Sequence, residues 1–227
     1  MTERVGAIVP AAGRSARMAG VDKLFIPLDG RPLLSWCVEA LERCPLVTQI
    51  AVSVACDQMP AVERMSRERG WEKTWIAPGG LRRQDSVANA LCALGDVDWV
   101  VVHDGDRPFL DEQLIERGLL AARETGVAVA CVPVKDTVKV VDGDGVVVTT
   151  LDRDVLRAVQ TPQVFRADII RHAYSDIEQT VTDDAMLAER LGYVVRLYEG
   201  SYENLKVTTP DDLLVAQSIG RRWSERT

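Results

Sequence analysis

VGAIVPAAGRSARMAGVDKLF, residues 5–25, begins as an apolar strand and continues as a loop of small residues and cations. Pro10 removes a backbone donor just after the strand, and the small residues 11–13 allow a ligand to approach the main chain closely. Backbone amides at such a turn bind anions. Three cations follow in the loop: Arg14, Arg17 and Lys23. We predict a phosphate-binding loop; a solvated basic loop is the alternative.

The two common phosphate-binding motifs are absent from this loop. A Walker loop needs GxxxxGK[ST], and the chain has no GK[ST]. A dinucleotide loop needs three spaced glycines and an acidic residue about 20 positions further on. Gly13 stands alone here, and the acid that ends the second predicted strand, Asp57, lies too far along. A phosphate site at this loop would therefore belong to another class.

Apolar, β-branched runs alternate with amphipathic stretches along the chain. The runs 5–9, 50–54, 99–103 and 127–134 predict strands buried on both faces, and the stretches 33–44, 59–69, 85–94 and 111–124 predict helices. This alternation indicates an α/β domain with a mainly parallel, twisted sheet and helices on both faces. No long linker interrupts it, so we expect a single domain, 1–227.

The segment TVKVVDGDGVVVTTL, 137–151, breaks the alternation. Two β-rich runs flank Asp142–Gly145, which predicts a protruding β-hairpin arm. The arm is too short to fold alone, so a second subunit is a candidate support. Further on we expect helices at 167–177 and 183–191 and strands at 193–199 and 203–207. A last helix is expected to be capped by Thr209.

Composition narrows the class of protein. The 227 residues are 47% hydrophobic and 27% charged and carry a net charge of −7, which argues against a large nucleic-acid footprint. None of the five cysteines forms CxxC, so we expect mostly buried thiols in a reducing cytosol and no metal site built from them. A strand by residue 5 leaves no room for a signal peptide, and no apolar run spans a bilayer. We expect a cytoplasmic protein without membrane contact.

Two further loops follow predicted strands, where ligands bind in open parallel sheets. In PGGLRRQDSVANAL, 78–91, a Gly79–Gly80 turn precedes Ser86, which we expect to open a helix; Asp85 or Ser86 as a plain cap is the alternative. In HDGDRPFL, 103–110, Asp104 ends a buried strand and is a candidate Mg²⁺ ligand. The alternative is a capping or Arg107-paired aspartate. We interpret His103 as a structural residue.

The remaining candidates lie downstream: Lys135, Thr137, Lys139, Arg153, Thr161, Thr182 and Lys206. Thr182 as the cap of the next helix is the plain alternative for that residue. The whole set offers cations, hydroxyls and one well-placed aspartate, but no Ser/His/Asp or Cys/His pair. Phosphoryl or nucleotidyl transfer needs charge stabilisation more than proton transfer, so it fits. A phosphate monoester, whose second pKa is about 6, would attack without a general base.

Eight blocks in order along nearly the whole chain carry a family resemblance: PAAGRSARM…DKLF, GGLRRQDSV, HDGDRPF, PVKDTVK, LDR, TPQVF, TDDA and NLKVTTPDDL. Together they resemble the 2-C-methyl-D-erythritol 4-phosphate cytidylyltransferases of the non-mevalonate isoprenoid pathway. The resemblance implies a Rossmann-like nucleotidyltransferase fold and a homodimer whose arms, 136–155, are exchanged. It implies that CTP and methylerythritol phosphate react, with Mg²⁺, to give the cytidine diphospho-sugar alcohol and pyrophosphate.

The resemblance also implies residue roles. Arg17 and Lys23 would stabilise the transition state at the α-phosphate, and Arg153 and Lys206 would position the substrate phosphate. Nucleotide contacts would come from Pro10, Ala11, Ala12, Gly13, Gly80, Ser86 and Asp104, with Asp104 also near Mg²⁺. The sugar-alcohol site would comprise Asp104, Gly105, Arg107, Thr137, Arg153, Thr161, Thr182 and Lys206, with Thr137 and Arg153 supplied by the second subunit's arm.

The chain departs from the family at Gly105 and Asp106, where two alanines are usual. Asp106 adds a negative charge near a site for anions. Three alternatives stay open at this point: a ribitol 5-phosphate cytidylyltransferase, a nucleotidyltransferase for another base, and a non-catalytic nucleotide-binding module.

Overall fold

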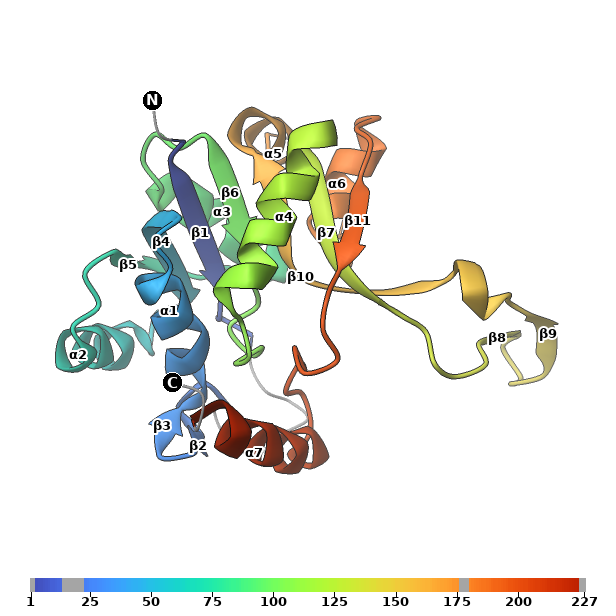
Figure 1. The fold of residues 1–227 in the computed structure, drawn as a ribbon, viewed down its shortest axis with the longest axis horizontal. Helices are drawn as coiled ribbons and strands as arrows, with labels where there is room; N and C mark the ends of the chain where they lie inside the picture. The colour runs from blue at the N-terminus through green and yellow to red at the C-terminus, as the bar shows by residue number, and fades with distance from the viewer. Residues whose placement is uncertain (1–2, 14–22, 176–179, 225–227) are drawn as a thin grey trace.

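A seven-stranded sheet forms the centre of the molecule (Figure 1). The computed structural model describes residues 3–13, 23–175 and 180–224. The sheet has the order β11-β7-β10-β6-β1-β4-β5, and only β10 runs antiparallel to its neighbours. Its strands are β1 (Val5–Pro10), β4 (Val47–Val54), β5 (Thr74–Pro78), β6 (Trp99–Val102), β7 (Val127–Pro133), β10 (Arg157–Arg166) and β11 (Arg196–Glu199). The predicted α/β class with a mainly parallel sheet is confirmed.

Helices cover both faces of the sheet (Figure 1). One face packs against α1 (Leu33–Arg43), α2 (Met59–Arg69) and α4 (Glu112–Thr125). The other face packs against α3 (Arg83–Ala93), α5 (Ala167–Ala173) and α6 (Ala185–Arg190). Strand β1 serves both cores, because Ala7 and Val9 enter the first and Ile8 enters the second. A strand that must be apolar on both faces explains the continuous run at 5–9.

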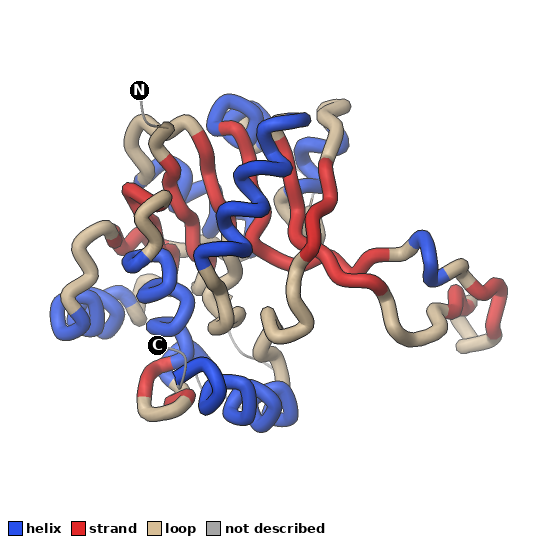
Figure 2. Tube along the Cα trace, viewed as in Figure 1, coloured by secondary structure: helices blue, strands red, loops and turns tan. Residues whose placement is uncertain are grey.

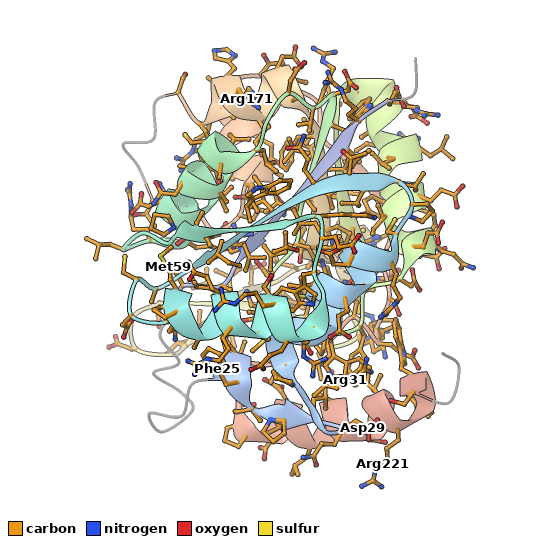
Figure 3. All side chains as sticks on the ribbon, turned by 90° about the vertical axis from the view of Figure 1, so that its left-hand side faces the viewer. Phe25, Asp29, Arg31, Met59, Arg171 and Arg221 are labelled. Carbon is orange, nitrogen blue, oxygen red and sulfur yellow. The ribbon has the colours of Figure 1, made fainter. Side chains whose placement is uncertain are left out.

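A third apolar cluster closes one end of the sheet. The short strands β2 (Pro27–Leu28) and β3 (Arg31–Pro32) pack with α7 (Pro210–Ser224), and Leu28, Trp36 and Ile219 are buried between them. Figure 3 shows Asp29 and Arg31 of this hairpin close to α7, on which Arg221 is labelled. The predicted cap is confirmed, since the Asp212 amide donates to Thr209 Oγ1 at 3.2 Å.

The predicted arm is present as β8 (Lys139–Val141) and β9 (Val147–Thr150), followed by the 3₁₀ turn η3 (Arg153–Val155). Figures 1 and 2 show it projecting from the body beyond β7 and β10. Asp142 Oδ1 closes the turn by accepting from the amides of Asp144 and Val146, at 3.1 and 2.9 Å. Every residue from 139 to 151 is exposed, including five valines. That the arm joins two subunits stays a prediction.

Four sequence expectations need correction. Residues 203–207 form no strand, because Leu205 and Val207 pack with the α7 cluster and only the Val207 amide bonds to a neighbouring segment. Helix α3 begins at Arg83, so Ser86 lies inside its first turn rather than opening it. Helix α5 ends at Ala173, short of 177, and β11 begins at Arg196, short of 193. None of the helices in the described ranges has the length and hydropathy needed to cross a bilayer.

Candidate active site

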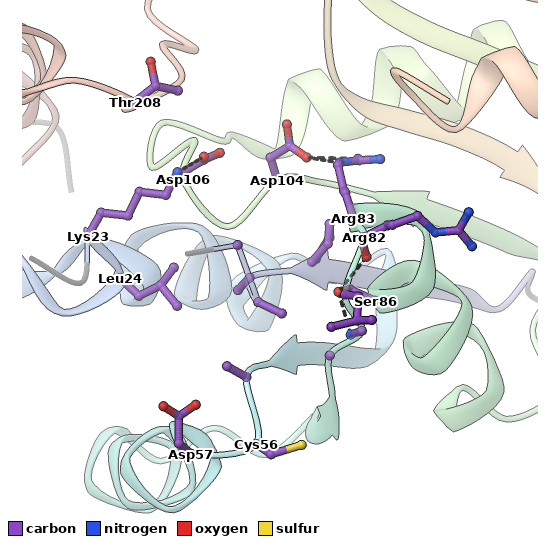
Figure 4. Close-up of a pocket in the computed structure, with 18 of the residues that line it drawn as sticks. Lys23, Leu24, Cys56, Asp57, Arg82, Arg83, Ser86, Asp104, Asp106 and Thr208 are labelled. Carbon is purple, nitrogen blue, oxygen red and sulfur yellow. Dashed lines mark hydrogen bonds and ion pairs between the residues drawn. The ribbon is translucent and has the colours of Figure 1, made fainter. Parts of the chain in front are cut away.

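A pocket of about 900 Å³ lies where the carboxyl ends of the parallel strands meet. The loop after β1, the glycine turn after β5, the turn after β6 and the segment before α7 contribute its walls (Figure 4). Its predicted lining residues are Pro10, Ala11, Ala12, Gly13, Lys23, Gly80, Ser86, Asp104 and Lys206, and Arg83, Asp106 and Thr208 join them. The volume is in the range of small-molecule sites.

The loop after β1 reaches the pocket as an extension of the strand. The Ala11 amide donates to the Ser53 carbonyl at 2.7 Å, which continues the pairing of β1 with β4. A Cβ at Gly79 would lie 2.1 Å from Ala12 Cβ, so the two loops meet closely only because both residues are small. Lys23 begins the 3₁₀ turn η2 (Lys23–Phe25) and points into the pocket (Figure 4). Arg14 and Arg17 lie outside the described residues.

The glycine turn after β5 is fixed by the first turn of α3. The Gly80 amide donates to Ser86 Oγ at 3.0 Å, and a Cβ at Gly80 would lie 2.2 Å from Asp85 Cβ. Asp85 Oδ2 accepts from the Arg82 amide at 3.0 Å, so Asp85 caps the start of α3, which was the alternative interpretation of this segment. Ser86 therefore shapes the turn that holds Gly80 at the pocket wall.

Asp104 is surrounded by cations. Its Oδ1 lies 2.9 Å from Arg83 Nε, and its Oδ2 lies 2.9 Å from Lys206 Nζ and 3.7 Å from Arg107 Nε. Burial alone would raise the pKa of Asp104, but the charges of Arg83, Lys206 and Arg107 outweigh burial and hold that pKa well below its usual range. Asp104 is thus an anchor for cations at neutral pH, and Arg107 is one of three cationic partners that it has in the described part of the chain.

A second carboxylate, Asp106, contacts the two lysines of the pocket. Lys23 Nζ lies 2.5 Å from Asp106 Oδ2, and Lys206 Nζ lies 3.9 Å from Asp106 Oδ1. Lys23, Lys206, Arg83 and Arg107 therefore carry four positive charges around two carboxylates, Asp104 and Asp106. Arg83 also pairs with the fully buried Asp184, at 2.8 Å. The local charge balance at the pocket floor favours an incoming anion, although the chain as a whole is acidic.

A buried network holds the Asp104 turn from behind. The Asp104 amide donates to Thr161 Oγ1 at 3.0 Å, and Thr161 Oγ1 lies 3.3 Å from His103 Nδ1. His103 Nε2 lies 3.0 Å from the Arg107 carbonyl, which accepts a hydrogen bond from the neutral ring. Burial lowers the pKa of His103 to about 4, so the ring is neutral at physiological pH. These contacts agree with the structural role predicted for His103.

Several predicted site residues lie elsewhere in this single chain. Thr161 and Gly105 are buried behind the pocket wall, and Arg107 is buried with its guanidinium donating to the Asn204 carbonyl at 2.7 Å. Thr137 and Arg153 lie on the arm, where Arg153 donates to the Lys135 carbonyl at 3.0 Å.

Thr182 is exposed and contacts only Met186 Sδ, at 3.8 Å, among the described residues. The Met186 amide donates instead to Asp183 Oδ1 at 3.0 Å, so the alternative of Thr182 as the helix cap is wrong.

Sequence reasoning missed Arg83 as a site residue. It bridges Asp104 and Asp184, and these two carboxylates outweigh burial to raise the pKa of its guanidinium. Thr208, which lines the pocket beside Lys206, was missed as well. The sequence signal for Arg83 was the pair Arg82–Arg83 after two glycines. Only the geometry of α3 shows that Arg83 points inward to Asp104, whereas Arg82 pairs with Asp85 at the surface.

The donor set fits a magnesium ion that arrives on phosphates. Within the described ranges no three His, Cys, Asp or Glu side chains cluster as a ready-made metal site. Asp104 and Asp106 are the carboxylates beside the lysines; lysine nitrogens already contact both, and Arg83 also contacts Asp104. Mg²⁺ uses one or two carboxylates together with substrate phosphates, and this pocket matches that pattern.

The match to known proteins covers nearly the whole chain. A family model described as 2-C-methyl-D-erythritol 4-phosphate cytidylyltransferase matches residues 5–222. The chain belongs to this family. Among relatives of that name, the one from Dehalococcoides mccartyi is 46% identical over 220 residues, covering 96% of this chain and 97% of the relative. The one from Geobacter metallireducens is 44% identical over 225 residues, covering 95% and 97%.

Solved structures of cytidylyltransferases share the fold. A 4-diphosphocytidyl-2C-methyl-D-erythritol synthase from Anaerococcus prevotii superposes with a TM-score of 0.86 at 29% identity, covering 98% of this chain and 100% of that one. The 2-C-methyl-D-erythritol 4-phosphate cytidylyltransferase from Thermus thermophilus gives a TM-score of 0.77 at 32% identity, covering 97% and 100%. The family resemblance and the nucleotidyltransferase fold expected from the sequence are both confirmed.

Proposed function

We propose that this chain transfers the cytidylyl group of CTP to 2-C-methyl-D-erythritol 4-phosphate, giving 4-diphosphocytidyl-2-C-methyl-D-erythritol and pyrophosphate. The observation that carries the proposal is the meeting of Lys23 and Lys206 over one pocket, beside the small-residue loop after β1. Family membership supplies the substrates, since the relatives are named for this reaction. Nucleotidyl transfer is an enzymatic activity that these cations suit, because charge builds at the attacked phosphorus.

The pocket residues would divide the work between the two substrates. The backbone of Pro10, Ala11, Ala12 and Gly13 would hold the triphosphate, and Lys23, with Arg17, would stabilise charge at the α-phosphorus. The Gly80 turn, fixed by Ser86, would receive the cytosine. Lys206, anchored by Asp104, would hold the substrate phosphate for attack. That phosphate is largely dianionic at neutral pH, so no side chain needs to remove a proton from it.

The sugar-alcohol end of the site would be completed by a second copy of the chain. Thr137 and Arg153 stand on an arm whose valines are exposed in one chain, and apolar surface of that kind is characteristic of an interface. In a homodimer with exchanged arms, Arg153 would approach the substrate phosphate across the interface. Thr161, Gly105 and Arg107, buried behind the wall, would support the site, and Thr182 would border it.

We propose Mg²⁺ as the metal, held mainly by the phosphates of CTP with Asp104 as the protein carboxylate. When bound, the ion would neutralise phosphate charge and polarise the α-phosphorus. Lys23, Lys206 and Arg83 would supply the fixed part of the same charge stabilisation. Cytoplasmic localisation, predicted from the cysteine pattern, stays a prediction.

Pyrophosphate release tests the proposal. CTP and Mg²⁺ are incubated with methylerythritol phosphate or ribitol 5-phosphate, and then UTP, GTP and ATP replace CTP. We expect release with CTP and methylerythritol phosphate at a rate well above every other pair. Turnover of ribitol 5-phosphate alone would overturn the substrate, and CTP binding without any release would indicate a non-catalytic module.

A further inference from the structure

The shortest contact at the pocket floor joins Lys23, the proposed catalytic lysine, to Asp106. Lys23 Nζ and Asp106 Oδ2 are 2.5 Å apart, and the two side chains are only 15% and 10% exposed (Figure 4). Hydrogen bonds between charged groups are stronger than neutral ones, and poor access to water weakens their screening. The ammonium group that an incoming phosphate would use is therefore already bound to an anion of the protein.

The backbone holds Asp106 rigidly in this position. The Asp106 carbonyl accepts from the Val207 amide at 2.8 Å, and the preceding Gly105 amide donates to the Pro10 carbonyl at 3.3 Å. A Cβ at Gly105 would lie 3.0 Å from Ala11 Cβ, so the turn packs directly against the phosphate loop. Asp106 Oδ1 is buried with no hydrogen bond among the described residues, and Lys206 Nζ lies 3.9 Å from it.

We infer that Asp106 is an internal competitor for the phosphates: it occupies Lys23 in the free protein and must release it before a polyphosphate binds. The inference rests on the proposed function for the role of Lys23. A ligand that binds only the released lysine has an apparent affinity reduced by the fraction of molecules in which Lys23 is free. Asp106 would thus set the affinity for the triphosphate and for pyrophosphate, while the nucleoside would bind independently of it.

This competition has a functional consequence for product release. Pyrophosphate leaves the site when its contact with Lys23 breaks. Because the Asp106 carboxylate is already aligned with Nζ, Lys23 can form its ion pair with Asp106 at that moment. Asp106 therefore weakens the binding of substrate and product together. Its main effect is on binding constants rather than on the stability of the fold.

The test is isothermal titration of Asp106→Asn, which keeps the shape of the side chain and removes its charge. The ligands are Mg·CTP, magnesium pyrophosphate and cytidine. We expect the Kd of Mg·CTP and of pyrophosphate to fall by about tenfold, because one charged hydrogen bond no longer competes for Lys23. The Kd of cytidine should stay within about twofold of its value in the unmodified protein. Asp106→Ala should also lower the Kd of Mg·CTP and of pyrophosphate and leave that of cytidine within about twofold.

Asp57→Asn is the matched control. Asp57 lines the rim of the same pocket, is exposed, and has no hydrogen bond or ion pair with any described residue; Figure 4 shows it apart from Lys23. Its loss removes the same charge, so a purely long-range effect would appear in both variants. We expect Asp57→Asn to change the Kd of Mg·CTP by less than about twofold, because exposed charges are screened by salt.

The outcomes separate this inference from the proposed function. Unchanged or weaker binding of Mg·CTP and pyrophosphate by Asp106→Asn would overturn the inference, as would an equal gain from Asp57→Asn. Cytidylyl transfer by the unmodified protein would then still stand. Tighter pyrophosphate binding without any transfer activity would support the inference and reject the function. Partial unfolding weakens binding, so it does not mimic the expected gain.

Discussion

Arg83→Met is the substitution that tests most directly how the site is held together. Arg83 lies 2.9 Å from Asp104 and 2.8 Å from Asp184, whose side chains are 8% and 0% exposed. When Arg83 is removed, Asp104 still has its ion pair with Lys206, whereas the one partner left to Asp184 among the described residues is the Tyr174 hydroxyl. The substitution therefore leaves one almost uncompensated charge in the interior.

Breaking a buried ion pair on one side costs about 3–5 kcal/mol, and the lower end applies because Tyr174 still donates to Asp184. For a chain of this size, about 3 kcal/mol lowers the Tm by roughly 6–12 °C. Urea and thermal unfolding at one protein concentration measure both quantities. Arg82→Met is the control, since Arg82 pairs with Asp85 at the surface and its loss should lower the Tm by a small fraction of that amount.

A double variant identifies the cause of the cost. If the uncompensated charge of Asp184 destabilises Arg83→Met, adding Asp184→Asn should recover part of the lost stability, giving a favourable coupling between the two positions. Equal Tm values for Arg83→Met and Arg82→Met, or a double variant that is less stable than the sum of the single changes, would refute the reasoning.

Three further predictions concern proton binding, rate and assembly. The unfolded chain binds the His103 proton more tightly than the folded one, so the free energy of unfolding should fall by about 3 kcal/mol between pH 6.5 and 4. His103→Asn should flatten that urea-unfolding profile, and His172→Asn, at the exposed second histidine, should not. Lys23→Ala should lower the single-turnover rate by about 10²–10³ with its circular dichroism spectrum unchanged; a normal rate would remove Lys23 from the mechanism. Mixing Lys23→Ala with Arg153→Ala after subunit exchange should restore activity, and no recovery would show that the arm does not complete the neighbouring site.

The strands that could be predicted are those whose surroundings demand apolar residues throughout. β1, β4, β6 and β7 lie inside the sheet with helices on both faces, so their sequences alone identify them. β10 was not predicted, because its sequence RAVQTPQVFR contains a proline and two glutamines and so is not a continuous apolar run. Its place depends on pairing with β6 and β7, far away in sequence. Residues 203–207 alternate like a strand, yet that alternation comes from packing on α7.

The site also has residues that the sequence predicts and contacts that it does not. Lys23 and Asp104 could be proposed because each follows a predicted strand, where ligands bind, and Lys206 because it is a lone cation within a strand-like segment. Which carboxylate each cation meets depends on how three separate segments close on one another, and no local pattern encodes that. The sequence identified Asp106 as unusual, but its contact with Lys23 joins residues 83 positions apart.

The central claim is that the phosphate of the sugar alcohol attacks the α-phosphorus of CTP at the cation-lined pocket. Methylerythritol phosphate carrying a heavy oxygen isotope in its phosphate group tests it, with mass spectrometry of both products after one turnover. The account predicts that all of the label stays in the cytidine diphospho-product, including its bridging position, and that the pyrophosphate is unlabelled. Label in the released pyrophosphate or in free phosphate would contradict it.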